Sequence, residues 1–474
     1  MIKTYRVDKL LKKFEIIEKK FKLDVHKINN VSWWDFSRYI IYEELLSKAN
    51  LNGNQFFKRK KAKKSFIKKI LNFTIKFYYF FNYLLFSKSP IWIKSHTNII
   101  FGHPRRVFEG KLYVDKYSDP FIEIFQDKVN FALIENSLSF KHFKPAKTKN
   151  LFYGESLIFI ANIISKFFYR KIPIKDKIFI KKLENSFYKN FKIKLNLLDL
   201  IKKRLPLYRA ELIIYKFFFK IKKPKKVIVV NSIGYESMIE AAKSLSIVTY
   251  ELQHGSPARG KLNYDYSSGL KKSSFPDFFL SFGKIFTNDI KLPISQKNII
   301  EVGFPYLNKK LSNTLNLLKK ENIFLIISQP NPISKILIDF SLNLRKKLSK
   351  DVRILYKPHP SEIFNEDTSY FKKLEENKIE VIKDYEVDLY KLLNKTKWII
   401  GVSSTVLYEA LAFNCKVFVF KAPGYERLTK LLNFDLIHLY KSTKNINELS
   451  NYNKKKKLIN IFYNDNNKKI KSLF

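Results

Sequence analysis

Cysteine is almost missing from this chain, since Cys415 is the only one among 474 residues. A lone cysteine cannot form an internal disulfide, which excludes disulfide-stapled secreted scaffolds and predicts a reducing compartment. Glycine is also scarce, at 12 residues, so a collagen-like class is excluded and a Gly-rich linker is not found. The first residues are charged and amphipathic rather than signal-like, so we expect a cytoplasmic protein.

Acidic residues are outnumbered: 42 Asp and Glu stand against 90 Lys and Arg, a net charge of +48. Two explanations stay open, a base composition rich in A+T codons and a polyanionic partner. The sequence lacks zinc-ligand spacing, an RNP-type motif and a helix-turn-helix signature, so no nucleic acid is expected. The favoured partner is the anionic inner face of a membrane, bound peripherally.

Long uninterrupted apolar runs are missing as well. The basic run KRKKAKK (58–64) precedes an apolar, aromatic stretch to Phe86, which Lys68, Lys69 and Lys76 interrupt. These charges argue against a transmembrane span and favour an interfacial anchor over 58–86. The alternative is a buried helix of the N-terminal domain with a solvated basic turn.

Apolar residues are abundant, at 46%, and 16% of the chain is aromatic, enough for two or three cored domains. Short apolar segments alternate with helical patterns in two series. This alternation predicts an α/β protein of two doubly wound, Rossmann-like domains facing a cleft, with ligands beyond the carboxyl ends of the strands. The expected strands are 98–102, 225–231, 247–255, 278–283 and 298–305, then 323–329, 352–358, 379–384, 398–402 and 416–420. We expect a basic helical region over 1–90, an N-terminal Rossmann-like domain over 91–310, and a C-terminal Rossmann-like domain with terminal helices over 311–474.

A small polar turn follows the apolar segment WIIGV (398–402). Ser403, Ser404 and Thr405 stand there, before the helical stretch VLYEALAF. Hydroxyls and free backbone N–H groups at a helix start favour an anion. The alternative is ordinary N-capping, for which one such residue suffices.

A cationic loop follows the expected strand VRILY. Lys357, His359 and Pro360 belong to it, and two prolines around the histidine fix its direction. A lysine and a histidine at a strand end suit a diphosphate, and His359 could give a proton to a departing nucleotide. A rigid surface loop is the alternative.

A histidine loop follows an expected strand of the first series. His254 stands between Gln253 and Gly255, with Arg259 nearby. The glycine permits close approach of a ligand. A histidine with a pKa near neutrality suits a base that deprotonates an acceptor hydroxyl. The alternative, which is more common for a single histidine, is a structural residue whose hydrogen bonds are made within its own loop.

Together, these elements resemble the GT-B transferases of bacterial surface polysaccharides: CDP-glycerol glycerophosphotransferases of teichoic acid synthesis, and capsule Kdo- and sialyltransferases. The shared features are His359-Pro360, Ser403-Ser404-Thr405, Gln253-His254-Gly255, Val302-Gly303-Phe304-Pro305, and Pro276-Asp277-Phe278 to Gly283. The resemblance covers about 225–425 and does not reach 1–220.

The resemblance implies a role for each matched residue. The residues on the donor side would be Lys357, His359, Pro360, Ser403, Ser404, Thr405, Glu409, Gly303 and Gln329, and Glu409 would contact the donor ribose or sugar. The residues on the acceptor side would be Gln253, Gly255 and Arg259. His254 would act as the base. It also implies a nucleotide-activated donor, cytidine-linked (CMP or CDP) rather than UDP or GDP, and a glycan or lipid-linked acceptor.

Two departures from the family pattern are informative. The acidic pair followed by glycine that supplies the base in sialyltransferases is missing from the first domain, which favours His254. No Asp-x-Asp occurs, so no metal and no cofactor is expected, and lysines and histidine would neutralise the phosphates. A second His-Pro, His103-Pro104 before Arg105 and Arg106, reads as a structural turn or as an acceptor-side element.

Two rival interpretations remain. A UDP-N-acetylglucosamine 2-epimerase has the same fold but needs acidic residues flanking the sugar, which are few here. A basic membrane- or nucleic-acid-binding protein without enzymatic activity would explain the charge but not Lys357–Pro360 and Ser403–Thr405 at strand ends.

Overall fold

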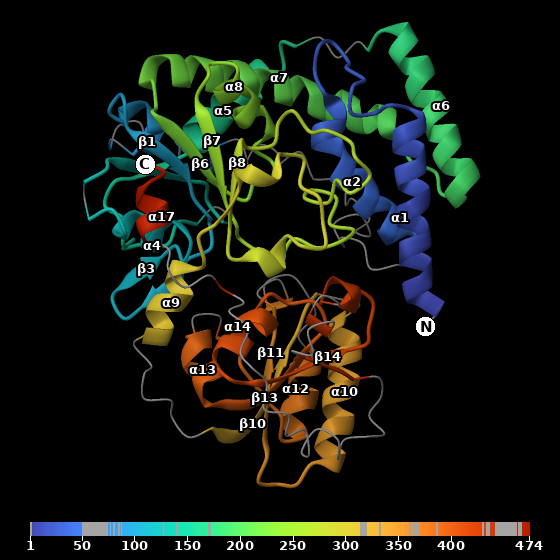
Figure 1. Ribbon diagram of the computed structural model, residues 1–474, viewed down its shortest axis with the longest axis vertical. Coiled ribbons are helices and arrows are strands. Elements are labelled where there is room, and N and C mark those ends of the chain that lie inside the picture. Colours follow the sequence, from blue (N-terminus) through green and yellow to red (C-terminus); the bar gives the residue numbers. More distant parts are fainter. Residues whose placement is uncertain are drawn as a thin grey trace. The chain divides into compact units, whose positions relative to one another are not determined.

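The computed structural model divides the chain into two compact units. The N-terminal unit comprises Tyr5–Pro305 with Asp465–Phe474, and the C-terminal unit comprises Tyr306–Asn464 with Met1–Thr4 (Figure 1). The structure describes residues 2–49, 74–75, 77–78, 81–83, 86, 88–126, 128–138, 141–168, 172–312, 320–330, 333–359, 362–363, 369–384, 387–428, 431–432, 437–440, 462 and 467–474. The basic run 58–64 lies outside them, as do Pro360 and most of 58–86.

Parallel strands form the centre of the N-terminal unit. The strands are β1 (Asn98–Phe101), β4 (Phe131–Glu135), β5 (Leu151–Tyr153), β6 (Lys226–Val230), β7 (Val248–Leu252), β8 (Phe278–Ser281) and β9 (Ile299–Glu301). Their order is β5-β4-β1-β6-β7-β8-β9, and every pairing is parallel. A small antiparallel hairpin, β2 (Val107–Glu109) with β3 (Leu112–Val114), follows β1.

Helices cover both faces of this sheet. The helices of the N-terminal unit are α1 (Ile2–Lys20), α2 (Trp33–Lys48), α4 (Ser118–Glu123), α5 (Glu155–Ile164), α6 (Ile174–Phe191), α7 (Leu197–Lys222), α8 (Glu236–Lys243) and α17 (Asn467–Lys471). Its 3-10 turns are η2 (Pro90–Trp92), η3 (Lys284–Phe286) and η4 (Gln296–Asn298). Residues of α5, α7 and α8 share a core with one face, while α4 and α17 pack on the other. Burial on both faces is why strands such as KVIVV are continuous apolar runs.

The first two helices belong to the same compact unit as the sheet, rather than forming a region of their own. Residues of α1 and α2 share a core with α6 and the first half of α7. Their attachment is also ionic: Arg38 on α2 is buried, pairs with Glu18 on α1 (Nε–Oε1, 2.5 Å) and donates from Nη1 to the carbonyl oxygens of Leu262 and Asp265. These contacts fix the loop that follows β7.

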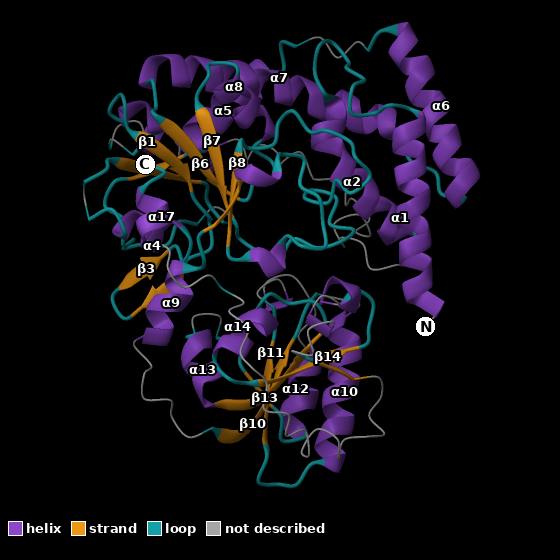
Figure 2. Ribbon diagram, viewed as in Figure 1, coloured by secondary structure: helices purple, strands orange, loops and turns teal. Residues whose placement is uncertain are grey.

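The C-terminal unit repeats the doubly wound pattern. Its elements are α9 (Pro305–Ser312), β10 (Glu321–Ile327), α10 (Ile333–Lys347), β11 (Arg353–Lys357), α12 (Ser369–Glu376), β12 (Glu380–Val381), α13 (Leu389–Lys395), β13 (Thr396–Gly401), α14 (Val406–Ala412), β14 (Lys416–Phe420), η5 (Tyr425–Leu428) and β15 (His438–Tyr440). The strands are all parallel, in the order β12-β11-β10-β13-β14-β15, with α10 and α12 packed on one face (Figure 2). Numbered along the chain, this is the Rossmann order 3-2-1-4-5-6.

Two doubly wound parallel sheets confirm the predicted fold class. Each expected strand overlaps an observed one, but β2, β3, β4, β5 and β15 have no predicted counterpart. Runs of three to five apolar residues are too short for periodicity to distinguish a strand from a helix turn. Within the described residues, no helix is long and apolar enough to cross a membrane.

Replacing Arg38 with alanine should destabilise the N-terminal unit strongly, because the Glu18 carboxylate would stay buried without its partner. We expect a loss of about 3–5 kcal/mol in the free energy of unfolding, measured by urea denaturation. Lys203→Ala breaks the exposed pair with Asp199 and should cost at most about 1 kcal/mol. Equal losses in the two variants would contradict the assignment of Arg38 as a buried anchor.

Candidate functional site

The carboxyl edge of the C-terminal sheet contains its topological switch point. The first strand of the unit, β10, lies between β11 and β13, so the connections that leave β10 and β13 diverge. In doubly wound sheets, ligands bind at this position. Because neighbouring strands lie about 4.8 Å apart, the ends of β11 and β13 are separated by roughly 10 Å.

A side-chain clasp joins the two diverging loops. Gln329, which follows β10, donates from Nε2 to Ser403 Oγ (2.9 Å), and its Oε1 accepts from the Ser403 backbone N–H (2.9 Å). Both residues were predicted donor-side residues, and the structure brings them into direct contact. The clasp fixes the start of the 403–405 turn against the end of β10.

The remaining residues of this turn have separate roles. Ser404, the residue before the N-cap, accepts with its Oγ from the Val406 backbone N–H (3.3 Å), so one of the first N–H groups of α14 is already satisfied. Thr405 occupies the N-cap position without a side-chain cap bond, and Glu409 is buried on α14. Because α14 has only seven residues, the turn's hydroxyls and N–H groups matter more for an anion than the helix dipole does.

Lys357 and His359 lie beside this clasp, at the end of β11. The Ser328 N–H donates to the Lys357 carbonyl oxygen (3.0 Å), which ties the β11 loop to the β10 loop. Burial lowers the pKa of Lys357, and Asp384 opposes that shift. Lys357 and the half-buried His359 therefore follow β11 at the same edge of the sheet as Ser403, which follows β13.

Glu362 is a site residue that the sequence analysis missed. Its side chain is fully buried and accepts from the His359 N–H (2.6 Å), Ser328 Oγ (3.0 Å) and Tyr370 Oη (3.1 Å). The Glu362 N–H donates back to the His359 carbonyl oxygen (2.8 Å). This exchange has the form of a capping box, but His359 stands where that motif has Ser or Thr, so no short motif in the sequence indicates Glu362.

In the N-terminal unit, His254 stacks on a second histidine. Its ring centroid lies 5.3 Å from that of His103, with an interplanar angle of 25°. Tyr117 Oη donates to the His254 carbonyl oxygen (2.8 Å), and Asp115 accepts from the backbone N–H groups of both His103 (3.0 Å) and Tyr117 (3.0 Å). The loop of His103 and Pro104 therefore adjoins His254 and is not an isolated turn.

Electrostatics keep both rings neutral. Desolvation, followed by His103 and Lys261, holds the pKa of His254 well below its usual range. Burial likewise lowers the pKa of His103 to about 4, against the opposing charge of Asp115. The expectation of a His254 pKa near neutrality is therefore wrong for the free chain, because burial among cations penalises the imidazolium. His254 Nδ1 is buried and finds no hydrogen-bond partner in the part of the chain that the structure describes.

The predicted acceptor-side residues have mainly structural contacts. Gln253 is buried and accepts from Ser281 Oγ (3.1 Å) and the Phe282 N–H (2.8 Å). Arg259 pairs with Asp265 (2.9 Å) and Glu15 (2.9 Å), so two carboxylates already neutralise its charge. The geometry places both residues in the scaffold of the His254 loop, next to Gly255.

Gly303 lies in the N-terminal unit, not with the donor-side residues of the C-terminal unit. Its φ of +74° is a conformation that glycine adopts readily. With Gln253, Tyr117 and Phe304 it lines a cavity of about 20 Å³, room for roughly one water molecule.

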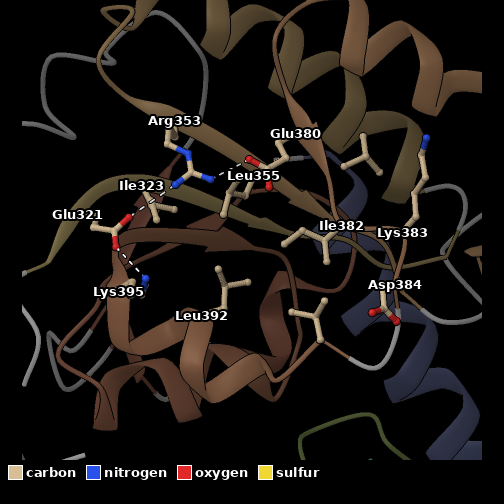
Figure 3. A pocket seen from close by; sticks show the side chains of 12 residues that line it. Glu321, Ile323, Arg353, Leu355, Glu380, Ile382, Lys383, Asp384, Leu392 and Lys395 are labelled. Carbon is tan, nitrogen blue, oxygen red and sulfur yellow. Dashed lines mark hydrogen bonds and ion pairs between the residues drawn. The ribbon is translucent and has the colours of Figure 1, made fainter. Parts of the chain in front are cut away.

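A groove of about 500 Å³ occurs elsewhere in the C-terminal unit (Figure 3). Its lining comes from the starts of β10 and β11, from β12 and the loop after it, and from α13; ion pairs join Glu321, Arg353, Glu380 and Lys395 across it. None of the predicted site residues lines it. Among the described residues, no group of three or more His, Cys, Asp or Glu side chains could hold a metal ion.

Comparisons with known proteins give similarity to solved structures only. No protein-family model matches the chain, and no curated protein matches it. A UDP-GlcNAc 2-epimerase from Methanocaldococcus jannaschii is 14% identical with a TM-score of 0.48, covering 80% of this chain and 98% of that one. The UDP-GlcNAc 2-epimerase from Neisseria meningitidis bound to UDP-GlcNAc is 12% identical with a TM-score of 0.45, covering 75% of this chain and 91% of that one. A variant of the wall teichoic acid polymerase TagF is 14% identical with a TM-score of 0.44, covering 85% of this chain and 96% of that one. Similarity of this degree carries no conclusion about this chain's activity.

Glu251, on β7 three residues before His254, should make stability depend on pH. Burial raises the pKa of its carboxyl to about 7, despite hydrogen bonds from Tyr264 and Ser232. The folded chain thus holds a proton that the unfolded chain releases near pH 4.5, so the free energy of unfolding should fall between pH 4.5 and 7, by at most about 3 kcal/mol.

Glu251→Gln should remove this part of the pH dependence, measured by denaturant unfolding from pH 4 to 8. Glu301→Gln, in β9 of the same sheet, is the matched control. Identical pH slopes for wild type and Glu251→Gln would contradict the raised pKa.

Proposed function

We propose that this chain is a GT-B-type transferase that moves a sugar, or a polyol phosphate, from a nucleotide-activated donor to a growing surface glycan. The observation that carries the proposal is the Gln329–Ser403 clasp at the switch point, with Lys357 and His359 on the neighbouring strand end. A fixed cluster of hydroxyls, N–H groups and cationic side chains at this position suits a nucleotide diphosphate.

On this proposal, the C-terminal unit binds the donor. Ser403, Thr405 and the backbone of their turn donate hydrogen bonds to the phosphates, and Lys357 supplies positive charge. His359 stabilises the negative charge that grows on the nucleotide as the bond to the transferred group breaks. Glu362 positions His359 by holding its N–H, so its contribution is indirect.

His254 is proposed as the base. The acceptor hydroxyl oxygen forms a bond to the sugar carbon, or to phosphorus in polyol phosphate transfer, while the bond to the nucleotide phosphate breaks. The hydroxyl proton passes to His254, and the nucleotide leaves with the electron pair. An anionic group bound beside His254 would raise its low pKa, because an adjacent negative charge favours the imidazolium. His254 would thus become basic when substrate is present.

The proposed donor is cytidine-linked, CMP or CDP, which is what the His359-Pro360 and Ser403-Ser404 motifs imply through their family resemblance. Glu409 would contact the donor ribose or sugar on the same ground, and a glycan or lipid-linked molecule would accept the transferred group. A screen of CMP-, CDP-, UDP- and GDP-linked compounds by mass spectrometry tests the donor. Conversion of UDP-GlcNAc to its 2-epimer without nucleotide release would instead identify an epimerase.

Replacing His359 with alanine should weaken donor binding and turnover together, because it removes a hydrogen-bond donor to the phosphates. We expect a loss of about 10²–10³-fold in donor turnover, measured as nucleotide release. His438→Ala, in β15 of the same sheet, is the matched control and should leave release near wild type. If His359→Ala retains both binding and release, the donor site is misplaced.

His254→Ala should separate nucleotide binding from transfer. We expect nucleotide binding within about twofold of wild type, measured by calorimetry, and transfer reduced by about 10²–10⁴-fold. His103→Ala should lower transfer and shift its pH profile, because the His103 ring stacks on His254 and helps to bury it, and burial is the main cause of the low pKa of His254. His96→Ala, at an exposed turn, serves as control. Loss of nucleotide binding in His254→Ala would reassign His254 as a donor ligand.

A further inference from the structure

The second half of α7 has an apolar face on each side. Tyr215, Phe218 and Phe219 are buried against the sheet. Ile213, Phe217 and Ile221 follow each other at intervals of four residues, which places them on one side of the helix, and they are 48%, 64% and 49% exposed. A soluble surface helix normally presents polar residues there.

This exposed stripe continues beyond both ends of the helix segment. At the C-terminal end, Lys222 Nζ donates to the Ile91 carbonyl oxygen, and Ile91 and Trp92 are 40% and 53% exposed. At the other end, Arg209 lies over the Phe168 ring (4.8 Å), next to Phe167, which is 84% exposed. The stretch from Arg209 to Lys222 is about 20 Å long.

The exposed charges on this part of α7 have one sign. Arg209, Lys216, Lys220 and Lys222 surround it. Between residues 200 and 222 the sequence contains one carboxylate, Glu211, which accepts from Ser237 Oγ on α8 and is turned toward the protein. Lysine stems can cover apolar surface while their ammonium groups reach phosphate headgroups.

Anionic lipid fits this surface better than a second copy of the chain. Protein interfaces are depleted in lysine at their centre, and a symmetric dimer would place these cations against their own copies. Apolar side chains between basic ones, without exposed acid, are typical of elements that lie in the membrane interface.

We propose that the exposed face of α7 from Arg209 to Lys222, together with Ile91, Trp92 and Phe167, docks on an anionic bilayer. None of these residues belongs to the basic run 58–64. It does not rest on the proposed enzymatic activity, and its test does not use a substrate.

Trp92 provides a direct probe. The other three tryptophans, Trp33, Trp34 and Trp398, are at most 8% exposed. With vesicles of brominated phosphatidylglycerol and phosphatidylcholine, wild-type fluorescence should be quenched, and Trp92→Phe should abolish most of that quenching while the protein still binds. Vesicles of phosphatidylcholine alone should bind more weakly, and salt should reduce binding.

Phe217→Glu should weaken co-sedimentation with the anionic vesicles at least about tenfold, because it removes an exposed aromatic ring that the bilayer would bury and adds a negative charge. Ile16→Glu, at a site 63% exposed on α1, is the matched control and should bind like wild type. Circular dichroism would verify folding of both variants. The proposal is overturned if wild type does not bind, if Trp92 stays unquenched in bound protein, if Phe217→Glu binds normally, or if light scattering shows that Phe217→Glu disrupts a dimer instead.

Discussion

Parallel pairing is the constraint on which the rest of this structure depends. Because β10 is both the first strand of its unit and a central strand, the loops after β10 and β13 leave the sheet at one edge in diverging directions. Residues 74 positions apart, Gln329 and Ser403, can then hydrogen-bond to each other. The N-terminal sheet has an analogous order, with β1 between β4 and β6, and His103 follows β1 in the same way.

Buried carboxylates hold the loops that carry the candidate chemistry. Glu362 gathers donors from the β10 and β11 loops, and Asp115 accepts from the loop of His103 and from Tyr117. In both cases the charge is satisfied by several hydrogen bonds, which is the condition for keeping a carboxylate away from water. Lys357, His359 and His254 are therefore held in place by hydrogen-bonded loops rather than by a long helix.

The two histidine environments differ physically. His359 lies half-buried at a strand end beside Lys357, whereas His254 is enclosed with His103 among cations that suppress its protonation. A histidine held neutral in the free chain and made basic by an arriving anion couples base strength to substrate binding. This coupling is part of the proposed mechanism.

Local signals in the sequence predict the two α/β series and the positions of Ser403–Thr405, Lys357 and His359 at strand ends, because continuous apolar runs and turn residues can be read over a few positions. They also indicate His254. Only the folded chain shows that Gln329 hydrogen-bonds to Ser403, that His103 stacks on His254, that burial lowers the pKa of His254, and that Arg259 pairs with Asp265 and Glu15. Those outcomes depend on which strands become neighbours and on how deeply each charge is buried, and neither quantity is encoded in any short stretch of residues.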